Sequence, residues 1–483
     1  MSDVFTPRDY QALGIDLITR APADEGFMLA FPPGSGKTPT ALTAADILMN
    51  LDLRYSRCLI VGPKLVAEEV WVRESPKWNH LKHLKIWCIP TSLFRYKVKR
   101  TTHQVDEIEV SEYERILDDR IASRRDILTR PEQIMTVSRD NFWWLTKVMG
   151  AKWPWDLVIW DESTSLKTHD SQRSKAVRFL RSKGLIKFFV PLSGTPRPKS
   201  LEQFWSQIRL IDGGRRLGET LGAFRGRYMT PVQMEVRGRP VIKWKDRVGA
   251  LDEAMAACKD ICLSVRSSVW RKTEPPLIAE RVLTLPDRAR ALYEELADRK
   301  VLRIGAGVTA PDAAVLAGKL LQLAAGFIYD DEGQAHWVHD EKIEALVELL
   351  EELEGEPVMV LYWHKAVAKR MQEKVKGLVS TKSKGFLDRF AAGQIKALAL
   401  HPASAGHGLD GLQRGGHHVA CVELFPDWEY FQQAVSRLDR GGQEHRVTVH
   451  QFIAADTRDE RICRILADGE ACQERVIEAL LHR

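Results

Sequence analysis

The pattern with the clearest chemical meaning is a short glycine-rich turn near the amino terminus. It reads Pro33-Gly34-Ser35-Gly36-Lys37-Thr38 and lies between an apolar stretch and a helical pattern. Glycines let successive backbone N–H groups point into one concavity, and a helix start adds its positive dipole end, so such a turn suits a phosphate group. The lysine of such a loop reaches the outer phosphates of ATP, and the threonine hydroxyl holds Mg²⁺. The sequence therefore predicts an ATP·Mg²⁺ site at Gly34, Ser35, Gly36, Lys37 and Thr38, although the full motif has glycine where this chain has Phe31.

A pair of carboxylates follows another apolar stretch further along the chain. Leu157–Trp160 is typical of a buried strand, and Asp161 and Glu162 come directly after it. At the carboxyl edge of a strand near the glycine-rich turn, Asp161 would bind Mg²⁺, mostly through water, and Glu162 would polarise the attacking water. The alternative is an ordinary helix cap, since acidic residues are common there. The upstream turn favours the catalytic interpretation.

The elements that would position these groups are short apolar runs that alternate with helical patterns. The first part of the chain has candidate strands at residues 26–31, 57–62, 133–137, 156–160 and 188–192, and candidate helices at 37–50 and 66–74. The pattern returns later, with a helix at 341–353 and strands at 357–362, 395–400, 418–423 and 446–453. Strands that alternate with helices favour a parallel sheet covered on both faces.

This pattern predicts an α/β protein with two parallel-sheet lobes and a mostly helical connector between them. We place the first lobe at 1–212, the connector at 213–335 and the second lobe at 336–483. The connector begins with consecutive glycines and arginines, and Pro275-Pro276 interrupts it.

Composition sets broad limits on function. The net charge of +6 and the pI near 8.8 permit a polyanionic partner without requiring one. We see no secretory signal and no apolar run of about 18 residues, so we expect a cytoplasmic protein with no membrane span. Of the seven cysteines, only Cys258 and Cys262 are close in sequence, which favours reduced thiols over a zinc site.

With the motifs in this order, the chain resembles the superfamily two helicases, and among them the Swi/Snf-related ATPases, especially small phage or bacterial ones. Pro7-Arg8-Asp9-Tyr10-Gln11 resembles the adenine-reading segment, so the resemblance adds Arg8 and Gln11 to the ATP site. Further segments resemble family motifs at residues 59–64, 136–139, 161–167, 193–196, 401–410 and 433–443. The chain departs from the pattern at Ser163 and Thr164, where the family has Ala and His, and at Asp439, where the family usually has His.

The resemblance implies RecA-like lobes and roles for further residues. Arg437 and Arg440 would stabilise the charge that develops on the γ-phosphate, and on a predicted helix this spacing would place both on one side. The alternative is two arginines on a solvated surface. The resemblance implies that the DNA backbone is contacted by Lys64, Ser138, Arg139 and Ser404. It also implies that ATP hydrolysis is coupled to motion by Ser193, Thr195 and Gln433.

The function expected from this resemblance is an ATPase that moves along double-stranded DNA. A strand-separating helicase on DNA or RNA is one alternative, and an ATP-switched DNA clamp is another, although a pure switch need not retain Glu162 and both arginines.

Two polar clusters have simpler explanations at this stage. His401, His407, His417 and His418 crowd one region, but their spacing fits no familiar zinc pattern, so we disfavour a metal there. The basic run at Arg95, Lys97, Lys99 and Arg100 is typical of a solvated edge.

Overall fold

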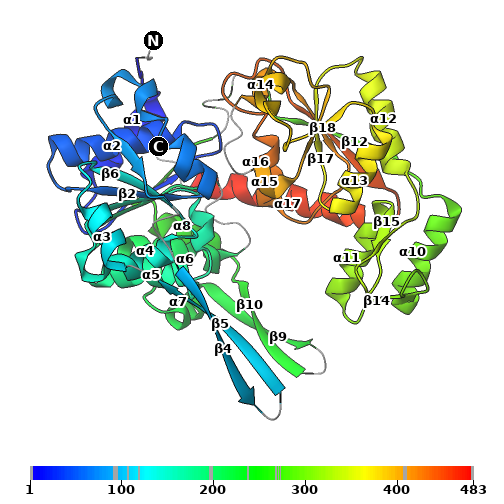
Figure 1. The fold of residues 1–483 in the computed structure, drawn as a ribbon, viewed down its shortest axis with the longest axis horizontal. Coiled ribbons are helices and arrows are strands. Elements are labelled where there is room, and N and C mark those ends of the chain that lie inside the picture. The colour runs from blue at the N-terminus through cyan, green and yellow to red at the C-terminus, as the bar shows by residue number, and fades with distance from the viewer. Residues whose placement is uncertain are drawn as a thin grey trace. The chain divides into compact units, whose positions relative to one another are not determined.

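The computed structural model describes most of the chain. Its described residues are 4–90, 96–105, 108–117, 120–194, 200–236, 239–266, 269, 271, 273–405 and 411–479. They divide into two compact units, the first formed mainly by residues up to Arg266 and the second mainly by Ser267–Glu474. Each unit is built around a parallel sheet (Figure 1).

The sheet of the first unit has five strands in the order β3-β6-β2-β7-β8, and every neighbouring pair is parallel. Its strands are β2 (Cys58–Gly62), β3 (Ile86–Cys88), β6 (Ile134–Ser138), β7 (Leu157–Trp160) and β8 (Phe188–Pro191). All residues of β2, β6, β7 and β8 are buried, which explains why these strands are continuous apolar runs in the sequence. The four strands predicted at 57–62, 133–137, 156–160 and 188–192 are confirmed.

The strand before the glycine-rich turn continues this sheet. β1 (Met28–Ala30) lies beside β8 through parallel bridges that join Gly26 to Phe189 and Leu29 to Leu192. On its other side β1 pairs in parallel with β11 (Cys262–Ser264), and the Ser264 hydroxyl donates to the carbonyl of Ala30 at 3.0 Å. The predicted strand at 26–31 is confirmed, whereas β11 lies in the stretch that we expected to be the connector.

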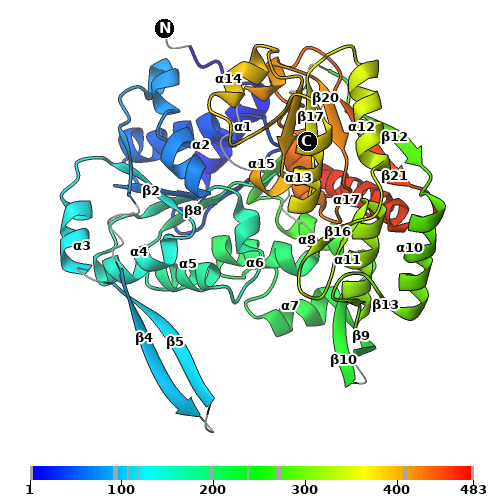
Figure 2. The same cartoon turned by 45° about the vertical axis from the view of Figure 1, so that its right-hand side comes forward.

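Helices cover both faces of the first sheet. They are α1 (Asp9–Arg20), α2 (Lys37–Asp46), α3 (Arg120–Leu128), α4 (Phe142–Met149), α5 (Gln172–Ser182), α6 (Leu201–Asp212), α7 (Leu221–Tyr228) and α8 (Ala250–Ala257). Figures 1 and 2 show α1 and α2 on one face and α4, α5 and α6 on the other. The predicted helix at 37–50 ends in a π-helical turn, Ile47–Leu51, and the one at 66–74 is a π-helical turn at Val66–Val70 followed by turns.

Two antiparallel hairpins extend from the first unit (Figure 2). One joins β4 (Tyr96–Val105) to β5 (Ile108–Leu117), and the other joins β9 (Met229–Val236) to β10 (Arg239–Asp246). Lys97, Lys99 and Arg100 of the basic run lie on β4, and Arg95 lies outside the described residues.

The sheet of the second unit has six parallel strands in the order β12-β21-β20-β17-β19-β18. Its strands are β12 (Leu277–Leu283), β17 (Val358–Leu361), β18 (Leu378–Ser380), β19 (Ala397–Leu400), β20 (His418–Cys421) and β21 (Thr448–Ala454). All four strands predicted for the second lobe are confirmed, and β12 adds an edge strand from the expected connector.

Alternate strand residues of this sheet pack against helices on opposite faces. The helices are α10 (Asp287–Arg299), α11 (Ala313–Ala324), α12 (Glu341–Glu352), α13 (Lys365–Lys374), α14 (Phe386–Ala391), α15 (Pro402–Ala405), α16 (Trp428–Val435) and α17 (Arg458–Ala479). Val358 and Val360 pack with α12 and α13, whereas Met359 and Leu361 pack with α14, α16 and α17. The apolar stripe predicted at 341–353 is therefore core packing.

The stretch at 213–335 is shared between the two units, with residues up to Arg266 in the first and the rest in the second. Beside its helices α7, α8, α10 and α11 it contains the β9–β10 hairpin and two small antiparallel pairs. These pairs are β13 (Val301–Leu302) with β14 (Val308–Thr309) and β15 (Phe327–Tyr329) with β16 (Ala335–Trp337).

None of the helices in the described part of the chain combines the length and the apolar character that a membrane span requires. The cysteines whose side chains are described are all free thiols.

Candidate nucleotide-binding site

The predicted site residues of the first unit gather at one edge of its sheet. The glycine-rich turn follows β1, Lys64 follows β2, Ser138 ends β6, Asp161 follows β7 and Ser193 follows β8. Because these strands are parallel, all five positions lie at their carboxyl ends, the edge where open α/β sheets bind ligands.

The glycine-rich turn has the backbone geometry of a phosphate loop. Gly34 and Gly36 have φ angles of +80° and +82°, a region that favours glycine, and Gly36 directly precedes α2 as its N-cap residue. The Lys37 ammonium donates to the carbonyl oxygens of Phe31 and Pro32 at 2.8 and 3.2 Å. Thr38, the second residue of α2, is half-buried. The turn therefore places a cation and a hydroxyl beside a helix N-terminus.

Phe31 occupies the position where the full motif has glycine. Its side chain is completely buried, and its ring meets the Tyr10 ring edge-to-face at a centroid distance of 5.4 Å. Phe31 therefore joins the phosphate loop to α1 through packing, while its backbone carbonyl still accepts from Lys37.

Gln11 lies directly against the phosphate loop. A Cβ atom added at Gly36 would come within 2.3 Å of the Gln11 amide nitrogen, so a side chain at position 36 would displace Gln11. The Gln11 amide oxygen accepts from the backbone N–H of Arg8 at 2.9 Å, which fixes the start of α1. The structure thus places Gln11 beside the loop and Arg8 beside Gln11, and the ATP-binding roles of both residues stay predictions.

The acidic pair is held by contacts with neighbouring elements. Asp161 donates its backbone N–H to Val61 at 2.7 Å, and its carboxylate accepts from the indole of Trp71 at 2.9 Å and from the Glu162 N–H at 3.0 Å. Glu162 has a φ of +53°, which is uncommon for a residue with a side chain. Such backbone strain is often found at functional sites, and here it falls on the predicted catalytic carboxylate.

The residues that depart from the family pattern connect the acidic pair to α6. Ser163 is fully buried and its hydroxyl donates to the Gln207 side-chain oxygen at 2.7 Å. The Ser206 hydroxyl donates to the Leu166 carbonyl, also at 2.7 Å. Thr164 is buried as well. The contact that Ser163 makes is one that an alanine could not form.

Ser193 belongs to the same network. Its backbone N–H donates to Leu29 of β1 at 3.1 Å, and the neighbouring Leu192 carbonyl accepts from the Ser163 N–H at 2.8 Å. The chain after β8 is therefore bonded to the strand of the phosphate loop and to the acidic segment. Thr195, the other coupling residue predicted here, lies outside the described residues.

These groups fit a magnesium nucleoside triphosphate. The positive φ angles of the turn and the helix start suit phosphate oxygens, and the Thr38 hydroxyl and the Asp161 carboxylate are oxygen ligands of the kind that Mg²⁺ takes. Bound there, Mg²⁺ would neutralise charge on the phosphates.

The residues predicted to contact DNA differ in exposure. Lys64 is exposed, Ser138 is buried and Arg139 is half-buried. Arg139 lines a pocket of about 270 Å³, whose other lining residues are Asp140, Trp143, Ser171, Gln172 and Arg173. Across this pocket Arg173 pairs with Asp140 at 2.6 Å.

In the second unit, the helix predicted to hold both arginines is shorter than expected. Gln433 lies on α16, but α16 ends at Val435, so Arg437 and Arg440 lie in the turns that follow. The prediction that one helix face presents both arginines is therefore wrong. The backbone N–H groups of Arg437 and Leu438 bond three residues back, and Leu438 is fully buried, which turns the chain out of the α-helix.

Two buried polar side chains fix this turn. Asp439, where the family usually has His, pairs with Arg271 at 2.5 Å, and burial raises the pKa of Asp439 although Arg271 opposes the shift. The Gln443 amide donates to the carbonyls of Gln413, Gly416 and Leu438 at 3.0–3.2 Å. The loop after α16 that carries Arg437 and Arg440 is thus held in place by the contacts of Asp439 and Gln443.

The segment after β19 carries the remaining predicted contact. Ser404 is exposed on α15, and its N–H donates to the His401 carbonyl at 2.8 Å. His401 contacts the Trp363 carbonyl at 2.9 Å, and the Trp363 ring stacks on His401 and on Phe425. Residues 406–410, including His407, lie outside the described part of the chain.

Trp71, Gln207 and Gln443 support the predicted site residues, and the sequence did not predict this role for them. Trp71 lies in an apolar pattern that indicates core, and Gln207 lies within a helix, so neither carried a signal of its own. Gln443 is the last residue of the segment at 433–443 that resembles a family motif. This position was the only feature of the sequence that indicated a role for it.

Comparison with known proteins agrees with the geometry of the first unit. The SNF2-related domain family matches residues 10–306. The putative protein p41 of Acyrthosiphon pisum secondary endosymbiont phage 1 is 30% identical over 493 aligned positions, which cover 99% of both chains.

Longer relatives match over part of their length. The putative ATP-dependent helicase/translocase YwqA of Bacillus subtilis is 24% identical over 67% of this chain and 36% of its own length. The RNA polymerase-associated protein RapA of Pseudomonas putida is 24% identical over 65% of this chain and 36% of its own length. Among solved structures, a Sulfolobus solfataricus SWI2/SNF2 ATPase core in complex with dsDNA aligns with a TM-score of 0.41 at 19% identity, covering 99% of this chain and 94% of that one.

The match to the family extends from α1 through the phosphate loop and the acidic pair, and it covers more than half of the chain. The chain therefore belongs to the SNF2-related family of helicase-like ATPases.

Proposed function

We propose that this protein hydrolyses ATP with Mg²⁺ and uses the energy to move along double-stranded DNA, in phage or bacterial DNA metabolism. The observation that carries the proposal is the convergence of the phosphate loop, Asp161 and Glu162 at the carboxyl edge of one parallel sheet. The phage relative supports this setting, and the relation to YwqA, a putative ATP-dependent helicase/translocase, supports translocation.

In the proposed reaction the first unit binds the nucleotide and activates water. Gly34, Ser35 and Gly36 offer backbone N–H groups to the phosphates, and the Lys37 ammonium leaves the Phe31 and Pro32 carbonyls to meet them. Thr38 and Asp161 hold Mg²⁺. Glu162 orients the attacking water and polarises it.

The second unit supplies positive charge in the transition state. Arg437 and Arg440 lie in the loop that follows α16. We assign to them the stabilisation of the negative charge that develops on the γ-phosphate during cleavage. Such arginines accelerate phosphoryl transfer by orders of magnitude. Because they belong to a different unit from Asp161 and Glu162, hydrolysis and release would alternate with movement of the units.

Contact with DNA would be through its phosphate backbone. Lys64, Ser138, Arg139 and Ser404 are the residues that we assign to it, and Ser193, Thr195 and Gln433 would link hydrolysis to movement. Backbone contacts carry no sequence information, so binding should tolerate any sequence and weaken steeply with salt.

The deciding experiment compares the ATPase rate with duplex DNA, single-stranded DNA, RNA or no nucleic acid. Strongest stimulation by duplex DNA supports the translocase. A preference for a single strand would instead favour a strand-separating helicase, and a slow rate that no nucleic acid changes would favour an ATP-switched clamp. Displacement of a triplex-forming strand from duplex DNA then tests movement itself.

A further inference from the structure

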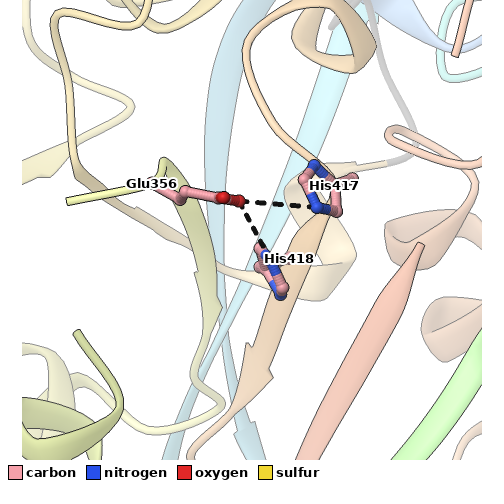
Figure 3. A group of neighbouring side chains, drawn as sticks. All are labelled: Glu356, His417 and His418. Atoms are coloured by element: carbon pink, nitrogen blue, oxygen red, sulfur yellow. Dashed lines mark ion pairs between the residues drawn. The ribbon is translucent and has the colours of Figure 1, made fainter. Parts of the chain in front are cut away.

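Three side chains outside the proposed nucleotide site meet at the opposite edge of the second sheet. His418 is the first residue of β20, His417 precedes it, and Glu356 lies two residues before β17. β17 and β20 are parallel neighbours with Val358 opposite His418, so their amino ends bring the three residues together. Figure 3 shows both imidazoles turned toward the same carboxylate.

The distances within this cluster match the spacing of ligands around a metal ion. One oxygen of Glu356 lies 3.4 Å from Nε2 of His417 and 3.2 Å from Nε2 of His418. The three ligand atoms all lie within 4.8 Å of one another. A tetrahedral zinc site with bonds of about 2.0–2.1 Å separates its ligand atoms by roughly 3.3 Å. Two of the three separations already have that value.

The second ring nitrogen of His418 has the partner that a ligating histidine needs. Its Nδ1 lies 3.1 Å from Nε2 of His450 on β21. A histidine that binds a metal through one nitrogen usually donates the N–H of the other to a nearby acceptor, which fixes the tautomer and the ring orientation. Here that bond would leave the Nε2 lone pair of His418 directed at the cluster.

The backbone before the two histidines is shaped for this approach. A Cβ atom added at Gly416 would lie 2.5 Å from the carbonyl oxygen of Pro357, so only glycine lets this segment come so close to the chain beside Glu356. The His417 carbonyl then accepts from Thr448 of β21 at 2.9 Å, and the His417 ring stacks on His445 at a centroid distance of 4.8 Å. His418 therefore contacts β21 through His450, and His417 contacts β21 through Thr448 and the preceding segment through His445.

We propose that Glu356, His417 and His418 bind one Zn²⁺ ion. Two imidazoles and one carboxylate form a donor set that suits zinc, whereas Mg²⁺ and Ca²⁺ prefer oxygen ligands alone. The Glu356 side chain is 52% exposed, so solvent water can take the fourth position. Cu²⁺ and Ni²⁺ would bind the same set, because affinity for imidazole sites generally rises toward copper.

The proposed zinc site is connected through Gln443 to the loop that carries Arg437 and Arg440. The Gln443 amide donates to Gly416, and its oxygen accepts from the N–H of His445 at 3.0 Å. An ion held by His417 and His418 would restrain Gly416, which directly precedes His417, and His445, whose ring stacks on that of His417. Both contacts of Gln443 would thus be held in place. The expected role is structural, at the sheet edge opposite the one that carries His401 and Ser404.

Zinc binding can be measured on the full-length protein without an affinity tag. The protein is equilibrated with ZnCl₂, dialysed, and analysed for metal by mass spectrometry, while a chromophoric chelator gives the dissociation constant by competition. We expect one zinc ion more per chain than in a His417→Ala/His418→Ala double variant. Co²⁺ in place of Zn²⁺ should give the visible absorption of a tetrahedral site, and this signal should be lost in the double variant.

Two single variants sharpen the test. Glu356→Gln, at an exposed position that preserves shape, should weaken zinc binding at least 10-fold. His83→Gln removes a histidine that contacts a single carboxylate, Asp46, at 2.8 Å, and should leave zinc binding unchanged. Equal zinc content in the wild type and the double variant, or unchanged affinity in Glu356→Gln, would overturn the proposal and leave a hydrogen-bonded cluster. No ATPase measurement enters, so this result is independent of the proposed function.

Discussion

The indole N–H of Trp71 donates to the carboxylate of Asp161 at 2.9 Å. Trp71 is fully buried, and Asp161 is the residue that we assign to Mg²⁺. A partner that holds a metal ligand in one orientation usually changes metal affinity when it is removed. Trp71 is therefore a positioning residue for the proposed magnesium site.

Trp71→Phe should raise the Mg²⁺ concentration needed for half-maximal ATPase activity by about 10-fold or more, because it removes the donor while an aromatic ring remains. A magnesium titration of the ATPase rate measures this shift. Trp155→Phe is the matched control, since Trp155 is equally buried and its indole nitrogen has no hydrogen-bond partner among the residues that the structure describes. Equal magnesium requirements in both variants would remove Trp71 from this role.

Lys37→Ala and Glu162→Gln should each abolish ATP turnover while the fold survives. The first removes the cation of the phosphate loop, and the second removes the carboxylate that polarises water. Steady-state phosphate release gives turnover, and circular dichroism reports folding. Near-normal turnover in Lys37→Ala would show that the phosphate-loop assignment is wrong.

Arg440→Ala should lower kcat by a factor on the order of a thousand and leave ATP binding largely intact, because the arginine acts on charge that develops in the transition state. Binding of a fluorescent ATP analogue and single-turnover hydrolysis separate the two effects. Arg461→Ala, at an exposed position on α17, serves as the control. An unchanged kcat would exclude Arg440 from this role.

Ser163→Ala should reduce the free energy of unfolding by about 0.5–1.5 kcal/mol, because it removes the 2.7 Å hydrogen bond to the buried oxygen of Gln207. Denaturant unfolding of the first unit measures the loss. Adding Gln207→Leu should recover part of it, since an apolar group then replaces the acceptor of the removed hydrogen bond. Failure of the second change to recover stability would show that the Ser163 bond is not the cause.

His339 should make stability depend on pH. Burial lowers the pKa of His339, so as the pH falls through about 6.5 the unfolded chain takes up a proton on this residue before the folded protein does. Its contribution is therefore present above pH 6.5 and is lost as the pH falls below that value, by at most about 1.4 kcal/mol per pH unit.

Comparing unfolding at pH 7.5 and 5.5 in the wild type and in His339→Gln isolates this contribution. Glutamine can still donate to the Leu323 carbonyl, which His339 contacts at 2.9 Å. The variant should lose less stability between the two pH values, and equal losses would contradict the assignment.

The sheets could be predicted because their strands are buried on both faces. β2 and β17 consist of apolar residues, and each has a proline directly beside it, so a composition pattern marks them directly. The phosphate loop and the acidic pair were visible for a related reason: both follow such strands, and parallel strands bring their carboxyl ends together.

Features that depend on distant contacts could not be predicted in the same way. Helix α16 ends at Val435 because Leu438 turns inward and Asp439 meets Arg271, a residue far away in sequence. The pairing of Glu356 with His417 and His418 depends on which strands are neighbours in the sheet. Histidine spacing alone therefore argued against a metal.

Strand β11 has a consequence for the order in which the chain can fold. The phosphate-loop strand β1 has β8 on one side and β11, at Cys262–Ser264, on the other. During synthesis β1 therefore keeps an open hydrogen-bonding edge until residue 264 has left the ribosome. A fragment that stops at residue 212 would expose that edge permanently, and unpaired strand edges invite aggregation.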